Sequence, residues 1–152
     1  MKIKHQTFID ERGSFTPIST NFCSKEWDQF NVVTNNDSYI FRGMHYQTNP
    51  PQTKCIKVVK GEIIDFWYDL ESNKVREFHL TSDDFLIVPN TQAHGYLTLT
   101  SDTVVVYMVQ GEYSPQSEKS IPWHSIKEIK TSISQYFDSP PEENIITSQK
   151  DS

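Results

Sequence analysis

The sequence lacks the residues of several common catalytic sites. It has no GxSxG motif, and its 152 residues include only five glycines, which form no glycine-rich phosphate loop. Its two cysteines, Cys23 and Cys55, stand apart without CxxC spacing. Two unpaired thiols are therefore expected in place of a redox pair or a zinc site. Proton transfer by other side chains and simple binding remain open.

The chain also lacks a surplus of positive charge and a long apolar segment. Fourteen Lys and Arg residues against 20 Asp and Glu residues give a net charge of −6. No overall basic field attracts nucleic acid or an anionic membrane, so an anionic ligand needs a local cluster of cations. No segment has the length of a signal-peptide core or a membrane-spanning helix. We therefore expect one cytoplasmic domain over 1–152, with neither nucleic acid nor membrane as partner.

From Tyr39 to Val109 the chain contains short segments rich in β-branched and aromatic residues, separated by turn formers such as Asn49-Pro50-Pro51. These closely and regularly spaced segments favour an antiparallel sandwich or barrel. The predicted segments are 38–41, 55–60, 62–70, 76–80, 85–89, 96–100 and 103–109.

Helix patterns occur only at the margins of this β region. A turn is expected within 24–30 and a helix within 124–137, where Ser125 and Glu128 have the spacing of a capping box. Residues 138–152 are predicted to form an extended polar tail interrupted by an Ile-Ile anchor. The predicted fold is thus all-β and antiparallel, with short peripheral helices.

Two histidines stand where strands begin or end, and imidazole is the side chain whose pKa lies closest to neutral pH. His45 ends the segment YIFRGMH, and His94 opens a strand in VPNTQAHGYL. Taken singly, a histidine at such a position is more often structural than catalytic. A barrel metal site of three histidines and a carboxylate usually needs a His-x-His pair. Here Tyr46 and Gln47 follow His45 without a nearby carboxylate, so no metal is expected.

Strict alternation along a strand would place Arg42 and His45 on opposite faces of a sheet. A shared site requires a β-bulge, and Gly43 is where one could form. On three other strands a polar residue stands an even number of positions from apolar ones and so lies on the same face as they do: Lys54, Asp65 and Tyr107. If these positions face inward, a lysine, a carboxylate and a phenol converge inside the barrel.

Five segments of the chain together resemble one known family. They are DERGSF at 10–15, RGMHYQ at 42–47, KCIKVVKGEIIDFWYDL at 54–70, FLIVPNTQAHGYLTL at 85–99 and VVVYMVQGEYSPQSEKSIPW at 104–123. In this order they resemble the dTDP-4-dehydrorhamnose 3,5-epimerases of nucleotide-sugar metabolism. The resemblance implies a cupin-type β-barrel, or jelly roll, and an isomerase that works without a cofactor.

The resemblance also implies a mechanism. The 4-keto group of a nucleotide-linked, dTDP-type 4-keto-6-deoxy sugar acidifies the protons on C3 and C5. A base can therefore remove one of these protons, and an acid can return it to the other face of the ring. By similarity His45 is the base and Tyr107 is the acid. Lys54 and His94 would stabilise the negative oxygen of the enolate intermediate.

A carboxylate behind the base would orient its ring and stabilise the imidazolium. In the family this carboxylate lies near the C-terminus, which corresponds to Asp151 in IITSQKD. Asp151 is the penultimate residue of this sequence, where chains usually fray. Asp65 is therefore the alternative partner of His45.

The resemblance further assigns substrate-binding residues and an assembly. Arg12 would neutralise the diphosphate of the nucleotide. Together with Phe15 it belongs to an N-terminal strand, about residues 1–20, that crosses to a neighbouring subunit, so a homodimer is expected. The other expected substrate contacts are Arg42, Gln47 and Asn35.

Two segments depart from the family pattern. The family usually carries a glutamate where this chain has Pro17, and a Val-Gln-Asp-Asn segment where it has Val-Val-Thr-Asn at 32–35. Both segments belong to the part expected to contact sugar and nucleotide.

Two alternative functions remain open. One is a sugar-nucleotide 3,4-ketoisomerase, although Gln47 stands where that family has its second histidine, and the other is a catalytically silent nucleotide-sugar-binding cupin.

Overall fold

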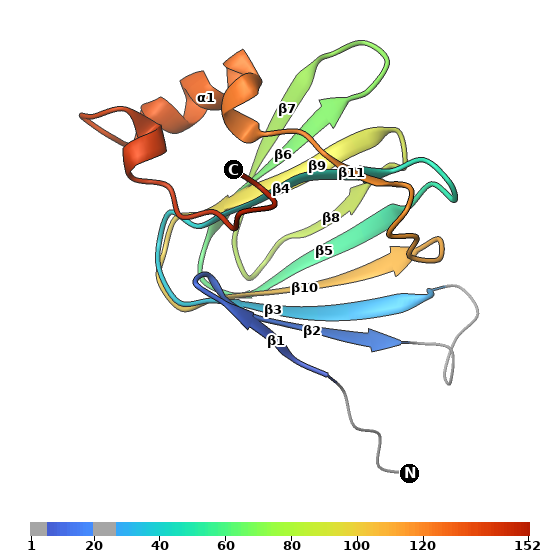
Figure 1. Ribbon diagram of the computed structural model, residues 1–152. Helices are drawn as coiled ribbons and strands as arrows, with labels where there is room; N and C mark the ends of the chain where they lie inside the picture. The colour runs from blue at the N-terminus through green and yellow to red at the C-terminus, as the bar shows by residue number, and fades with distance from the viewer. Residues whose placement is uncertain (1–5, 20–26) are drawn as a thin grey trace.

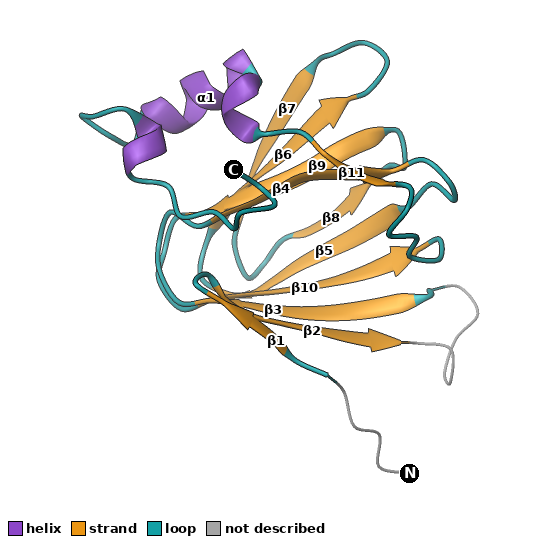
Figure 2. Cartoon of the chain, in the orientation of Figure 1, coloured by secondary structure: helices purple, strands orange, loops and turns teal. Residues whose placement is uncertain are grey.

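Two antiparallel sheets face each other across the interior of the chain (Figure 1, Figure 2). The computed structural model describes residues 6–19 and 27–152. The six-stranded sheet has the order β1 (Phe8–Asp10), β2 (Gly13–Ser19), β3 (Gln29–Asn35), β10 (Thr103–Gln110), β5 (Thr53–Lys60) and β8 (Phe85–Val88). The five-stranded sheet has the order β11 (Glu118–Ser120), β4 (Phe41–Gln47), β9 (Gln92–Thr98), β6 (Ile63–Asp69) and β7 (Val75–Leu80). All neighbouring strands pair antiparallel, which confirms the predicted all-β, cupin-type jelly roll.

The predicted β segments correspond to strands β4 to β10, with bounds that agree within two residues in all but two of them. β4 begins at Phe41, where the first predicted segment ends, and β9 begins at Gln92, before the predicted 96–100. The sequence pattern does not predict β1, β2, β3 or β11. In β3 the alternation is hidden because the buried positions Asn31 and Asn35 are polar, whereas Val32 between them is apolar and only partly buried. Polar side chains can face the interior at these positions of β3 because no apolar core fills that part of it.

The helical segments are shorter than the sequence predicts. The α-helix α1 (Lys127–Ser134) is preceded by a 3₁₀ turn (Trp123–Ser125), and a second 3₁₀ turn follows at Pro141–Glu143. The predicted capping box is wrong, because the hydroxyl of Ser125 donates to the carbonyl of Pro122 and the N-cap residue is Ile126. Residues 24–26 of the turn expected within 24–30 lie outside the described part, and residues 29–30 belong to β3. Cys23 also lies outside the described part.

Two apolar clusters support the five-stranded sheet from its two faces. On the outer face, Ile129 and Ile133 of α1 pack with Phe41 and Phe66. This packing explains why α1 covers β4, β9 and β6 in Figure 1. On the inner face, Trp67 packs with Ile56, Val58 and other residues between the sheets. The rest of the interior remains open.

Within the described residues, no helix is long and apolar enough to cross a membrane.

The segment 138–152 folds back onto the barrel, which corrects the predicted extended tail. The predicted Ile-Ile anchor explains how it docks. Phe41 N–H donates to the carbonyl of Ile146 (2.9 Å), and Ile146 N–H donates to the carbonyl of Tyr39 (3.0 Å). Ile145 packs against the outer apolar cluster. Asp151 is consequently only 1% exposed, although it is the penultimate residue.

Candidate functional site

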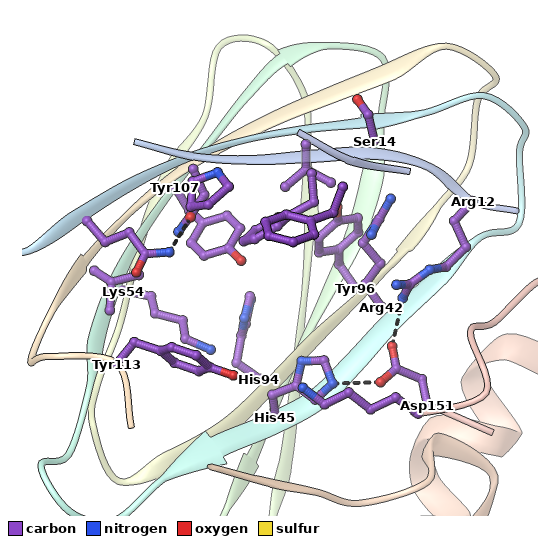
Figure 3. A pocket seen from close by; sticks show the side chains of 18 of the residues that line it. Arg12, Ser14, Arg42, His45, Lys54, His94, Tyr96, Tyr107, Tyr113 and Asp151 are labelled. Atoms are coloured by element: carbon purple, nitrogen blue, oxygen red, sulfur yellow. Dashed lines mark hydrogen bonds and ion pairs between the residues drawn. The ribbon is translucent and has the colours of Figure 1, made fainter. Parts of the chain in front are cut away.

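A cavity of about 580 Å³ lies between the two sheets (Figure 3). The five-stranded sheet contributes Arg42, His45, His94 and Tyr96 to its lining, and the six-stranded sheet contributes residues that include Lys54 and Tyr107. Arg12, Phe15 and Asp151 also line it. Most of the predicted site residues therefore come together in one cavity, from strands that are distant in sequence.

A β-bulge at Gly43 brings Arg42 and His45 to the same face. Arg42 pairs with Tyr96 and His45 pairs with His94, so two residues of β4 lie opposite the single residue Gly95 of β9. Gly43 has φ +111°, a conformation that other residues rarely adopt. The predicted bulge is thus present, and both side chains line the cavity.

Gly43→Ala should lower the free energy of unfolding by more than about 2 kcal/mol. The added Cβ would lie 2.5 Å from the His94 carbonyl oxygen and 2.7 Å from the Gly95 Cα, both of which belong to the backbone of β9. Chemical denaturation monitored by circular dichroism measures this loss. Ser101→Ala, in an exposed turn, is the control and should change stability by less than about 0.5 kcal/mol. Equal stability of the two variants would contradict the requirement for glycine.

His45 forms a dyad with Asp151. Its Nε2 lies 2.6 Å from Asp151 Oδ1, while Asp151 Oδ2 accepts from Arg12 Nη1 (2.9 Å) and from the Gly43 N–H (3.1 Å). Burial would raise the pKa of the Asp151 carboxyl, but its hydrogen bonds with His45 and Gly43 and the charges of His45 and Arg12 hold it below the usual value. Asp151 is therefore an ionised, fully paired carboxylate that fixes the His45 ring.

Asp65, the alternative partner, contacts the other histidine. His94 Nε2 lies 2.7 Å from Asp65 Oδ2, and Trp67 Nε1 donates to Asp65 Oδ1 (3.0 Å). Asp65 is fully buried and His94 is 7% exposed. The site thus contains two separate histidine–aspartate pairs, His45 with Asp151 and His94 with Asp65.

Lys54 and Tyr107 lie on the wall opposite His45, on the neighbouring strands β5 and β10. Burial lowers the pKa of the Lys54 ammonium to about 8, against the opposing effect of Glu118 and Asp65. Burial also raises the pKa of the Tyr107 phenol above its usual value. At neutral pH both groups are consequently proton donors that face the cavity.

Arg42 and Arg12 both line the cavity. Arg42 Nε donates to Asn35 Oδ1 (2.8 Å), and its Nη2 donates to the Thr34 carbonyl (3.1 Å). Arg12 is paired with Asp10 (Nη2 to Oδ2, 2.6 Å) as well as with Asp151. Two carboxylates thus already accept from Arg12, whereas no carboxylate among the described residues pairs with Arg42. Arg42 is therefore the guanidinium with unpaired charge that could hold an anion, and Arg12 stands beside it with its carboxylate partners.

Two predicted substrate contacts do not line the cavity. Asn35 is fully buried and holds Arg42. Gln47 is 4% exposed, and its side chain bonds the backbone of Pro50, Glu112 and Ser114. Both amides hold neighbouring parts of the chain, Asn35 the Arg42 side chain and Gln47 the backbone around 50 and 112–114. Pro17 and Val33, which both depart from the family pattern, do line it.

Sequence reasoning missed a cluster at the cavity formed by Tyr113, Glu118 and Lys150. Glu118 Oε2 accepts from Tyr113 Oη (2.9 Å) and from Lys150 Nζ (2.7 Å). Burial would raise the pKa of Glu118, but Lys150 holds it below its usual value. Tyr113 and Glu118 fall within the family-like segment 104–123, so this segment could have indicated them, whereas no motif connects them with Lys150.

The arrangement is suited to proton transfer on the two faces of a small ring. An imidazole backed by a carboxylate lies on one wall, and a protonated phenol lies on the other. A lysine and a second histidine can stabilise negative charge between them. Among the described residues, no three histidine, cysteine or acidic side chains cluster as a metal site.

Comparisons with known proteins indicate one family. The family model described as dTDP-4-dehydrorhamnose 3,5-epimerase matches residues 1–152. The chain is 31% identical over 134 residues to a protein of that name from Methanothermobacter thermautotrophicus, covering 80% of this chain and 72% of the relative. It is also similar to a crystal structure of that name from Bacillus anthracis with TDP and PPi bound, at 33% identity and a TM-score of 0.70, over 97% of this chain and 88% of the other. A third match is a crystal structure of that name from Sulfolobus tokodaii, with 31% identity, a TM-score of 0.64 and coverage of 95% and 82%.

Proposed function

Because this chain belongs to the dTDP-4-dehydrorhamnose 3,5-epimerase family, we propose that it epimerises a dTDP-linked 4-keto-6-deoxy sugar at C3, C5 or both. The observation that supports this most is that His45 and Tyr107 lie on opposite walls of one cavity. A base and an acid on opposite sides of a ring are what inversion of a carbon requires.

In the proposed reaction, neutral His45 takes the proton from the carbon next to the 4-keto group. The C–H electron pair moves into the ring, and negative charge develops on the keto oxygen as the enolate forms. Asp151 stabilises the imidazolium that results. Tyr107 then donates its phenolic proton to the opposite face of the same carbon, and the C=O bond is restored. Proton exchange with solvent returns His45 and Tyr107 to their starting states.

Lys54 and His94 are proposed to stabilise the enolate oxygen. The ammonium group faces the cavity from β5, and His94 faces it from β9 with Asp65 behind it. A preorganised donor of this kind is typically worth about 3 kcal/mol of barrier. The need for such a donor explains why a lysine is retained in a place where burial lowers its pKa.

The substrate is proposed to be a thymidine diphosphate sugar. The Bacillus anthracis relative holds TDP and PPi, and the cavity of this chain carries Arg12 and Arg42. Its volume of about 580 Å³ falls within the usual range for small-ligand sites. Pro17 and Val33 would give the wall near the nucleotide a less polar character than the family pattern has.

Incubation with dTDP-4-keto-6-deoxyglucose in deuterated water tests the proposal. An epimerase should incorporate deuterium at C3, at C5 or at both, and NMR assigns the carbon. A product with its carbonyl moved to C3 would instead identify a 3,4-ketoisomerase. Binding without exchange would identify a catalytically silent sugar-binding protein, and either outcome would refute the proposal.

The value of kcat/KM should fall as the pH rises above about 8. Lys54 stabilises the enolate only while it is protonated, and it loses its proton as the pH passes its lowered pKa of about 8. The pH profile of kcat/KM measures this alkaline limb. Lys54→Arg keeps its charge over the whole range, so its profile should lack the limb even if its rate is lower. An unchanged limb in this variant would assign it to another group.

We also propose that the chain forms a homodimer. In the single chain β2 pairs with β3, and β1 is an edge strand on which Ile9 is 81% exposed. An exposed edge strand offers unpaired backbone groups to a second chain. Val59 and Ile87 are also more than half exposed, on the six-stranded sheet. Sedimentation equilibrium would reveal the dimer, and a mass of one chain at micromolar concentration would refute it. Exchange of the N-terminal strand and a cytoplasmic location remain predictions.

A further inference from the structure

Tyr96 is a buried phenol in the cavity wall that the mechanism does not use. It belongs to β9, lines the cavity and is 3% exposed. On β4 its direct cross-strand neighbour is Arg42, and on β6 it is Asp65. Figure 3 shows it beside Arg42 and away from Tyr107, which projects from the opposite wall. The two phenols therefore serve different parts of the cavity.

Asn35 determines which way the Tyr96 hydroxyl can donate. Asn35 Oδ1 is occupied by Arg42 Nε (2.8 Å), and this leaves Nδ2 to donate to the Thr103 carbonyl (3.2 Å) and to Tyr96 Oη (3.4 Å). An amide nitrogen only donates, so Tyr96 Oη is the acceptor in this contact. The phenolic proton must point elsewhere.

No acceptor for that proton occurs among residues 6–19 and 27–152. A buried phenol normally finds a partner for its O–H group, and here the open side is the cavity. Burial raises the pKa of Tyr96 above its usual value, with Arg42 and Arg12 acting against the shift. The hydroxyl thus keeps its proton at neutral pH and can donate it to a ligand.

The charges around Tyr96 indicate what kind of ligand atom accepts this proton. Arg42 is its neighbour in the sheet, and the guanidinium of Arg12 also acts on it. The carboxylate of Asp65, its neighbour on β6, acts on it too but is already paired with His94 and Trp67. An oxygen placed near two guanidinium groups and a neutral O–H donor is best anionic. In a nucleotide sugar the anionic oxygens are those of the diphosphate.

We propose that Tyr96 is a substrate-binding residue whose phenol donates a hydrogen bond to a diphosphate oxygen held by Arg42 and Arg12. The inference rests on the proposed function only in that the ligand is a nucleoside diphosphate. Tyr107 acts on the sugar ring from one wall, and Tyr96 holds the diphosphate at the other. The residue after the glycine of the AHG segment thereby contributes to affinity for the diphosphate.

Tyr96→Phe removes only the hydroxyl group and should preserve the fold. Calorimetric titration with TDP, and separately with inorganic pyrophosphate, should show about tenfold weaker binding of both, since a hydrogen bond to a charged group is lost. Unchanged affinity for both probes would overturn the proposal. A loss confined to kcat would also overturn it, because it would assign the hydroxyl to the sugar ring.

Two matched variants make the experiment specific. Tyr136→Phe changes a 41% exposed tyrosine of the helical segment and should bind TDP like the wild type. Tyr107→Phe should bind TDP normally while losing the epimerised product, because the acid that protonates the opposite face is removed, and this is the reverse of the pattern expected for Tyr96→Phe. TDP binding needs no turnover, so weaker binding by Tyr96→Phe would support this inference even if the wild type showed no exchange and the proposed epimerase function failed.

Discussion

His45→Asn should reduce deuterium exchange at C3 and C5 by about 10³-fold or more, because the proposed reaction loses its base. The asparagine side chain cannot accept a proton at neutral pH, yet its amide can still hydrogen-bond Asp151. The ring of His45 has Asp151 as its hydrogen-bond partner among the described side chains, so the fold should survive. Exchange rates by NMR and kcat measured with the same preparation quantify the loss.

The matched control for this variant is His79→Asn. His79 lies on β7, pairs with Glu62 at 3.0 Å and is more than half exposed, and it does not belong to the cavity lining. We expect wild-type exchange from it. If His45→Asn retained full exchange with its circular dichroism unchanged, His45 would not be the base.

Asp151→Asn should lower kcat by about 10²–10⁴-fold with a smaller effect on KM. The carboxylate accepts from three donors, His45, Arg12 and the Gly43 N–H. An amide of the same size has only one accepting atom, so it cannot satisfy all of these donors, and it supplies no charge to stabilise the imidazolium. The ring-nitrogen chemical shifts of His45 should change in this variant, and steady-state kinetics measure the two constants.

Asp65→Asn is the informative comparison, because Asp65 contacts His94 at 2.7 Å and does not contact His45. In Asp65→Asn the ring-nitrogen chemical shifts of His94 should change, whereas those of His45 should stay as in the wild type. Loss of activity should follow here too, through weaker stabilisation of the enolate. A change at His45 in Asp65→Asn but not in Asp151→Asn would reverse the assignment of the two pairs.

Much of the barrel is predictable from local pattern. Strands β4 to β10 are recognisable because β-branched and aromatic residues cluster between turn formers. β3 escapes recognition because Asn31 and Asn35 face inward, where the cavity and Arg42 need polar groups. The capping box fails because Ser125 lies in a 3₁₀ turn one residue before the N-cap. In β3, polar residues of the site stand where a strand prediction needs apolar ones. At Ser125, the local turn geometry prevents the side chain from capping the helix as the motif predicts.

The candidate site was predictable where its residues lie in compact motifs. Arg42, His45, Lys54, His94 and Tyr107 all line the cavity, as the family-like segments imply. Their assigned roles remain predictions. Asn35 and Gln47, expected to contact substrate, are buried and do not line the cavity, and their role in binding stays a prediction. It overlooked Tyr96, Glu118 and Lys150, whose positions depend on how distant strands and the C-terminal segment meet.

The sequence by itself determined the approximate positions of β4 to β10, the charge balance and the ordered motifs that identify the family. Only the tertiary structure decided which aspartate meets which histidine. His45 and Asp151 are 106 positions apart, whereas Asp65 is much closer to both histidines along the chain. The choice depends on the bulge at Gly43 and on the docking of Ile146 beside β4, which together bring Asp151 to His45. Strand alternation sets only which face a side chain occupies, and the neighbours it finds there depend on the path of the whole chain.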